Sequence, residues 1–172
     1  LLHRVYLEAD VTYTHEGDGN STPVYTDDYD TALDGTVGFD MIEYVELEIG
    51  GQCIDKHYGD WMSIWTDLTH ASDAKSLLED MVSLTDSVTA TAADGGGAVV
   101  SGQKLYVPLQ FWFCRNPGLA LPLIALQSHE VKINVQFKSS VSLTPTAAGA
   151  SVVETVSLTS IDNCCVFCDY VF

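Results

Sequence analysis

A chain of 172 residues with 24 acidic and 7 basic side chains carries a formal charge of −17, which would repel nucleic-acid phosphates and anionic lipid alike. Its length and its apolar content of 47% are typical of one folded domain with a core of its own, and they exclude a disordered chain. No apolar run approaches the length that spans a bilayer, so we expect no transmembrane segment and no direct contact with nucleic acid.

The chain opens on the alternating pattern of a half-buried strand. Apolar residues at every second position share one face, and polar residues fill the positions between them; the apolar set is Val5, Leu7, Ala9 and Val11. Residues 14–38 then show neither a strand nor a helix period and are dense in Gly, Asn, Thr and Asp. This composition predicts a long surface loop.

The predicted loop 14–38 carries two candidate features. Asn20-Ser21-Thr22 is a glycosylation sequon, which makes Asn20 a candidate glycosylation site. Four aspartates could bind calcium but lack the ordered ligand spacing of an EF-hand; they are Asp27, Asp28, Asp30 and Asp34. We favour a solvated acidic loop over a calcium site.

Residues 39–49 form the next predicted strand, which ends at a glycine pair. Val45, Leu47 and Ile49 alternate with two glutamates, and Gly50-Gly51 follows as a turn. A helix is predicted after this, with Asp60 as its N-cap. Its apolar residues recur at helical spacing, and we expect the two indoles to hold this face against the sheet; the set is Trp61, Ile64, Trp65 and Leu68.

A second short helix is predicted after the first, capped by Ser72 or Asp73. Its apolar stripe consists of Leu77, Leu78 and Met81. Residues 85–102, rich in Thr, Ala and Gly, then predict another loop.

The segment 104–137 predicts two strands on either side of a corner. The first strand alternates through Leu105, Val107, Leu109, Phe111 and Phe113, and the second through Val131, Ile133, Val135 and Phe137. Between them, Arg115-Asn116-Pro117-Gly118 combines a fixed φ with a permissive glycine, and Pro122 cannot donate to a central ladder. The chain is expected to turn there.

Five cysteines, an odd number, argue against a fully paired disulfide framework. Cys165 and Cys168 have the spacing of a zinc knuckle, but a structural zinc site needs a second pair, and Cys53 and Cys114 are isolated. We therefore interpret the cluster Cys164, Cys165 and Cys168 as buried thiols that pack as small hydrophobic groups.

Catalytic patterns are weak in this sequence. Asp55, His57 and Asp60 could gather a metal, but only one histidine is present locally, whereas a cupin-type site needs several. His129 and Glu130 fall on opposite faces of a strand, which disfavours an acid–base pair. No nucleophile elbow or phosphate-binding glycine loop is present. We therefore expect no enzyme activity and no cofactor.

About six predicted strands with long loops favour a β-sandwich of the jelly-roll type. Two long segments support a more specific interpretation: GGQCIDKHYGDWMSIW at 50–65 and LYVPLQFWFCRNPGLALPLIALQSHEVKI at 105–133. Together with the opening LLHRVYLEA and the closing CDYVF, they resemble the major capsid proteins of the nucleocytoplasmic large DNA viruses.

The resemblance implies an all-β jelly-roll sandwich, one of a tandem pair, with one or two short helices in insertions between strands. Residues 1–172 would form a single jelly-roll domain, which we expect to be incomplete at its N-terminus and to lack the second, C-terminal jelly roll. Members of the family form trimers that act as pseudo-hexagonal capsomers of an icosahedral shell. The partners implied are two further copies, neighbouring capsomers and minor capsid proteins, and the location implied is the virion, assembled in the reducing interior of an infected cell.

Candidate anchors for contacts between subunits are the aromatic and corner residues Trp61, Trp65, Trp112, Arg115 and Asn116. Core packing is an equal explanation for the tryptophans, and a carboxylate of the same subunit would also satisfy Arg115. Two other functions remain open at this point. Jelly rolls also serve as glycan-binding, lectin-like modules, and a cupin-like metalloenzyme would contain stoichiometric metal.

Overall fold

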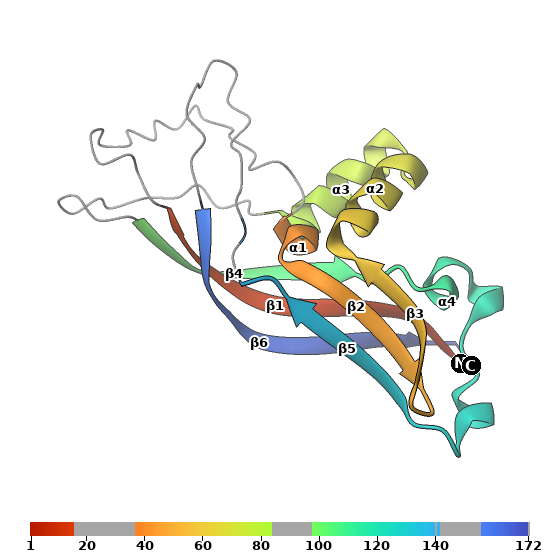
Figure 1. The fold of residues 1–172 in the computed structure, drawn as a ribbon. Coiled ribbons are helices and arrows are strands. Elements are labelled where there is room, and N and C mark those ends of the chain that lie inside the picture. Colours follow the sequence, from red (N-terminus) through yellow and green to blue (C-terminus); the bar gives the residue numbers. More distant parts are fainter. Residues whose placement is uncertain (16–36, 84–97, 140, 142–155, 172) are drawn as a thin grey trace.

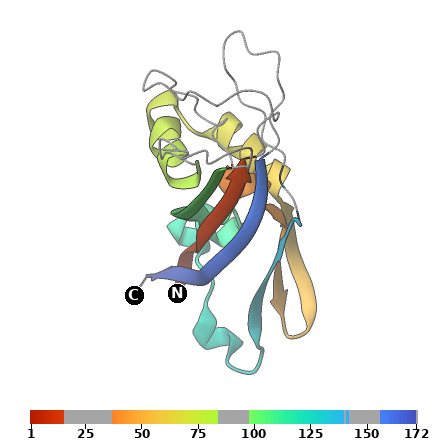
Figure 2. The same cartoon turned by 90° about the vertical axis from the view of Figure 1, so that its left-hand side faces the viewer.

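Two antiparallel sheets of three strands each account for the strands of the described chain (Figure 1). The computed structural model describes residues 1–15, 37–83, 98–139, 141 and 156–171. One sheet has the order β4-β1-β6 and consists of β1 (Leu2–His15), β4 (Ala98–Pro108) and β6 (Val156–Tyr170). The other has the order β3-β2-β5 and consists of β2 (Ile42–Ile49), β3 (Gln52–Tyr58) and β5 (Val131–Phe137). Figure 2 shows the two sheets as separate layers.

The core lies between these layers and follows the alternation of the sequence. On β1 the predicted inward residues are all buried, with Val11 and Ala9 fully inaccessible. Cross-strand register places Ala9 opposite Leu105 and Leu7 opposite Val107, so the two strands bury one shared face. From the second layer, Val45 and Leu47 of β2 are also inaccessible. The predicted faces of the opening strand and of strand 39–49 are therefore confirmed.

The β2–β3 hairpin depends on the glycine pair. Ile49 pairs with Gln52, which leaves Gly50 and Gly51 as a two-residue loop. Their φ values of +60° and +83° belong to the left-handed region, which matches the right-handed twist of a hairpin and excludes most other residues. The turn predicted at Gly50-Gly51 is confirmed.

Three helices lie at one end of the sandwich (Figure 1): α1 (Val37–Asp40), α2 (Gly59–Thr69) and α3 (Ser72–Val82). Both predicted helices are present, but Asp60 is not the N-cap of α2. Tyr58 occupies that position without a side-chain cap, and Asp60 lies in the first turn, where its carboxylate contacts Lys138 at 3.5 Å. A carboxylate in the first turn still interacts favourably with the helix dipole. The N-cap of α3 is likewise Ala71 rather than Ser72 or Asp73.

The corner between β4 and β5 contains short helical turns: α4 (Trp112–Arg115), η1 (Pro117–Leu119) and η2 (Leu123–Leu126). The strand predicted to run to Phe113 ends at Pro108, although Leu109, Phe111 and Phe113 are buried as expected. The chain therefore keeps its inward alternation after ladder pairing stops. The turn predicted at the Pro-Gly pair is confirmed.

Two predicted boundaries were wrong. The last five residues of the predicted loop 85–102 belong to β4, which begins at Ala98. The strand predicted for 39–49 begins at Ile42, because the residues before it form the helical turn α1. The composition of a short polar or glycine-rich segment does not show whether it will pair with a long neighbouring strand. Here the start of β4 is a strand because it pairs with β1.

The sandwich is open along β5 and β6, which are edge strands of their sheets. Val166 of β6 pairs with Leu7 and so points toward the core layer, yet 46% of its surface is exposed, against 2% for Leu7. The inward residues of β5 are only half-buried: Val131, Ile133, Val135 and Phe137. Within the described residues, no helix combines the length and the apolar character that crossing a bilayer requires.

Candidate protein interface

Helix α2 presents its apolar stripe to solvent rather than to the sheet. Trp61 is 38% exposed, Ile64 52% and Leu68 76%, and Trp65 is half-buried. The side facing the protein carries Gly59, Met62 and Thr66 instead. We predicted that the two indoles hold this face of the helix against the sheet. That prediction was wrong, because the face points to solvent.

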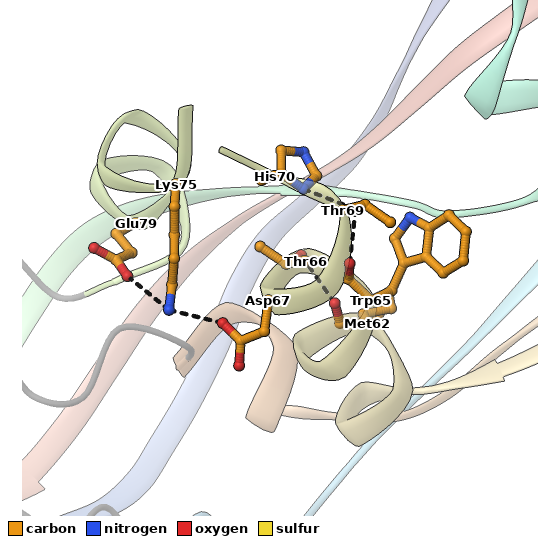
Figure 3. Close-up of polar contacts among 8 residues, drawn as sticks. All are labelled: Met62, Trp65, Thr66, Asp67, Thr69, His70, Lys75 and Glu79. Atoms are coloured by element: carbon orange, nitrogen blue, oxygen red, sulfur yellow. Dashed lines mark hydrogen bonds and ion pairs between the residues drawn. The ribbon is translucent and has the colours of Figure 1, made fainter. Parts of the chain in front are cut away.

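The physical reason lies at the start of the helix. A Cβ on Gly59 would lie 2.2 Å from the carbonyl oxygen of Phe39 and 2.5 Å from that of Ile42, so only glycine permits this approach. The close contact fixes the rotation of α2 and brings Met62, fully inaccessible, into the core. Thr66 can be buried on the same side because its hydroxyl donates to the Met62 carbonyl at 2.9 Å (Figure 3).

The neighbouring helix α3 does not cover the stripe. Lys75 of α3 reaches Asp67 of α2 at 2.7 Å, which ties the two helices together on the flank of α2 away from Trp65, and it contacts Glu79 of its own helix at 3.8 Å (Figure 3). In this view Trp65 points away from Lys75. The stripe and the α2–α3 contact therefore use different sides of the helix.

Arg115 joins the α2 stripe to the β4–β5 corner. Its guanidinium carbon lies 4.1 Å from the centre of the Trp65 ring, and the Trp61 and Trp65 ring centres are 5.8 Å apart. Nε and Nη2 of Arg115 both donate to the Gln110 carbonyl, at 3.3 and 3.1 Å. Within the described part of the chain, no carboxylate lies within ion-pair distance of Arg115. The structure thus brings together three of the five predicted anchors, Trp61, Trp65 and Arg115.

A hollow of about 340 Å³ lies beside this cluster, lined by Lys56, His57, Tyr58, Trp61 and Arg115. Lys56 lies 3.5 Å from the centre of the Tyr44 ring, and its ammonium contacts Glu46 at 3.6 Å. The hollow therefore combines aromatic walls with two cations. Sequence reasoning missed Lys56 and Tyr58, although both stand within the 50–65 segment beside the predicted helix.

His57 is the buried member of the group, at 7% exposure. Burial lowers its pKa below the usual 6.5, and the nearby Arg115 charge lowers it further, while Asp55 opposes both. Asp55 Oδ2 lies 3.2 Å from Nε2, but without hydrogen-bond alignment. The imidazole is therefore neutral at neutral pH and packs against Phe111, with ring centres 5.2 Å apart.

The metal candidates Asp55, His57 and Asp60 do not converge, because Asp60 faces Lys138. Across the described ranges, no three His, Cys, Asp or Glu side chains are arranged to hold a metal ion. His129 and Glu130 are both exposed, and Glu130 pairs with Lys132 at 3.0 Å.

The other two predicted anchors have local contacts of their own. Trp112 packs edge-on against Phe113, with ring centres 5.2 Å apart and planes at 90°. Asn116 Oδ1 accepts from the backbone N–H of Gly118 at 2.9 Å and so caps the η1 turn. Asn20 and the aspartates of the predicted acidic loop, Asp27, Asp28, Asp30 and Asp34, lie outside the described residues.

The interpretation of the cysteine cluster as buried thiols was wrong for two of its members. Cys164 and Cys165 are exposed, and only Cys168 packs partly against the core. The strand that carries them lies at an open edge, and an alternating apolar pattern cannot reveal whether a further strand covers it. Cys114 is the most protected thiol: burial raises its pKa to about 11.

The chain is similar to known proteins over most or all of its length. A family model described as "Major capsid protein N-terminus" matches residues 1–172. The major capsid protein of Pyramimonas orientalis virus is 42% identical over 172 residues, covering all of this chain and 37% of the relative. The major capsid protein of Paramecium bursaria Chlorella virus 1 is 46% identical over 103 residues, covering 59% of this chain and 21% of the relative.

Solved structures give the same result. A quasi-atomic model of the PBCV-1 virus capsid superposes with a TM-score of 0.57 at 33% identity, over 98% of this chain and 36% of that one. The present chain thus spans little more than a third of the length of the Pyramimonas orientalis virus protein and of the capsid chain in that structure.

Proposed function

The chain belongs to the family of major capsid protein N-terminal domains, and from this premise we propose that it is a jelly-roll building block of the icosahedral shell of a large DNA virus. The family match over all 172 residues is the observation that carries this proposal. The function is mechanical: the domain stands in the shell of the virion and packs against copies of itself.

The surface of the domain supports a cohesive role. Large apolar side chains are exposed on α2 and on β6, including Trp61, Ile64, Phe167 and Tyr170. Surfaces of this kind mark contacts with other protein rather than with water. The net charge of −17 disfavours the genome and anionic lipid as direct partners.

The proposed assembly is a trimer. Each subunit would contribute this jelly roll and a second one in tandem, which gives a pseudo-hexagonal capsomer that contacts its neighbours and minor capsid proteins. In a closed ring of three subunits, two different faces of one subunit meet at each contact. The half-buried inward residues of β5 and β6 would be covered by further strands of the same polypeptide.

Mass measurement of the complete gene product tests this proposal. Mass photometry and light scattering should give three chains per particle, and negative-stain images should show hexagonal outlines. A product that remains monomeric over the micromolar range would contradict the proposal.

A glycan-binding module is the second candidate, favoured by the hollow between Tyr58 and Trp61. Aromatic rings beside polar groups are typical of surfaces that stack on sugars. A module of this kind would stay small in solution and bind a sugar on a glycan array, and replacing Trp61 with Ala would abolish that binding. The capsid function predicts assembly without sugar.

A further inference from the structure

The exposed stripe of α2 and the Arg115 corner form one continuous surface, which we call the α2 surface. It consists of Trp61, Ile64, Trp65, Leu68 and Arg115. We propose that the α2 surface is a contact by which one copy of this subunit binds a second copy, with Arg115 meeting a carboxylate of that copy. This inference rests on the proposed shell function and specifies which residues do the binding.

The apolar side chains of the α2 surface are exposed on a helix whose position is fixed. The Gly59 contact fixes the rotation of α2, so Ile64 and Leu68 cannot turn inward without moving the helix. A rigid helix that presents apolar side chains at helical spacing matches the anchors of a helix-mediated protein contact. Because the backbone of the helix is already in place, binding costs little backbone entropy.

Arg115 is oriented but keeps N–H groups that are available to a partner. The Trp65 ring and the Gln110 carbonyl hold the guanidinium in one orientation and use only two of its N–H groups. Its other N–H groups have no carboxylate partner among the residues that the structure describes. A guanidinium oriented in this way is suited to bind a carboxylate of another molecule through two parallel hydrogen bonds.

The charge balance of the chain favours a second copy as the partner. The chain has only 7 basic side chains, and five of them already form ion pairs with its own carboxylates: Lys56, Lys75, Lys104, Lys132 and Lys138. Two copies with a charge of −17 each repel one another at long range, so a contact between them is favoured where it opposes a cation to an acid. Two cations remain. Arg4 is exposed on β1 and lies across from Asp169 of β6, whereas Arg115 belongs to the α2 surface and supplies the cation of this contact.

Each copy also supplies the acid. Several carboxylates are exposed and have no ion-pair partner in the described ranges, among them Glu43, Asp80 and Asp169. Asp169 shares the outward face of β6 with the exposed Phe167, so this face could meet the apolar part of the stripe. The contact joins unlike faces, as a closed ring requires.

A crosslinking experiment on the complete gene product identifies the molecule that covers the α2 surface. A photoreactive benzoyl-phenylalanine replaces Leu68, which is 76% exposed and so tolerates the change, and the assembled protein is irradiated. We expect a product with the mass of two chains. A crosslink within one chain, or no crosslink in a protein that assembles normally, would overturn the inference, because the stripe would then be covered by the same polypeptide or by nothing.

Substitutions test the energetics of the same contact. Ile64→Ser and Arg115→Glu should each weaken self-association at least about tenfold, as the loss of a central apolar or Arg anchor does. The matched control is Leu77→Ser on α3, which also removes an exposed apolar side chain, 69% accessible, and should change association little. An equal effect of all three variants, or none, would overturn the inference.

Two further readouts separate the possible failures. The melting temperature of each variant, measured below the association range, should match that of the unmodified protein, and a large loss would place the stripe inside the subunit and overturn the inference. If the unmodified protein assembles while the variants assemble equally well, the inference fails and the shell function stands. If the unmodified protein never assembles, the shell function itself fails.

Discussion

At the scale of single residues, the surface around Arg115 joins an oriented cation to a neutral imidazole. Arg115 is held by a ring and a carbonyl rather than by a carboxylate, and His57 is buried beside it. Arg115 is exposed, so water solvates its remaining donors, whereas burial disfavours the protonated form of His57. Arg115 therefore has donors available to bind a carboxylate, and His57 changes its protonation state with pH.

The pH dependence of stability should contain a contribution from His57. Its pKa in the folded chain lies below 6.5, mainly because of burial, so in the window below pH 6.5 the unfolded chain binds a proton that the folded chain does not. The free energy of unfolding should therefore fall as the pH drops from 6.5 to the pKa of His57 in the folded chain. Above pH 6.5, His57 should add nothing to the pH dependence of stability. Urea unfolding between pH 7.5 and 5 measures this.

The control for this measurement is His57→Gln, which should show a shallower fall of unfolding free energy over the same window. His129→Gln, at an exposed position, should retain the slope of the unmodified protein. Equal slopes for the unmodified protein and His57→Gln would contradict the role of His57.

Thiol reactivity should differ sharply between cysteines. The raised pKa of Cys114, about 11 against an ordinary 9.0, leaves about 100-fold less thiolate than an ordinary thiol at pH 8. Iodoacetamide should therefore modify the exposed Cys165 well before Cys114, as followed by peptide mass spectrometry. In urea the two rates should converge, and similar rates in the native protein would show that Cys114 is not protected.

At the scale of elements, the orientation of α2 decides what the surface displays. The helix has two sides that could face the protein, and the close contact of Gly59 with the Phe39 and Ile42 carbonyls selects the side with Met62. The selected side has less apolar area than the rejected one. The remaining apolar area, centred on Trp61 and Ile64, is thereby left for an outside partner.

Truncation of the two sides should reveal this orientation. Met62→Ala removes a fully buried side chain and should lower the free energy of unfolding by about 2–5 kcal/mol. Ile64→Ala removes a side chain that is 52% exposed and should cost less than about 1 kcal/mol in the dissociated protein. Chemical denaturation at dilute concentration measures both, and the reverse order would mean that the stripe packs inward.

At the scale of the whole molecule, charge opposes the assembly that the apolar surfaces favour. Each copy carries −17, so neighbouring subunits repel over distances that depend on salt, from about 30 Å at 0.01 M to about 3 Å at 1 M. Cohesion must then come from short-range contacts such as the α2 surface. The acidic balance keeps unassembled subunits apart until those contacts form.

Self-association should therefore strengthen with ionic strength. Raising sodium chloride from about 20 mM to about 500 mM screens the repulsion between copies and should lower the dissociation constant. Analytical ultracentrifugation of the complete gene product measures this change, with sucrose of equal osmolality as the control. Weaker association at high salt would mean that ion pairs, rather than apolar contacts, dominate the interface.

Alternation and turn chemistry determined the class of fold from the sequence alone. The inward faces of β1 and β2, the Gly50-Gly51 hairpin and the corner at Pro117 all follow from local rules, because period and backbone preference are properties of a few neighbouring residues. The resemblance carried by residues 50–65 and 105–133 identified the capsid family, which the match over the whole chain confirms. The jelly-roll class and the virion context followed from it.

Only the tertiary structure decided which side of α2 faces out, that Trp65 and Arg115 meet across 50 residues of sequence, and that β6 lies at an open edge with Cys164 and Cys165 exposed. An apolar stripe in the sequence predicts that one face of a helix will be covered, but it does not identify the segment or molecule that covers it. That choice depends on which backbones can approach one another, here at Gly59 against the carbonyls of Phe39 and Ile42. Such contacts join residues far apart in the chain, so no local pattern encodes them.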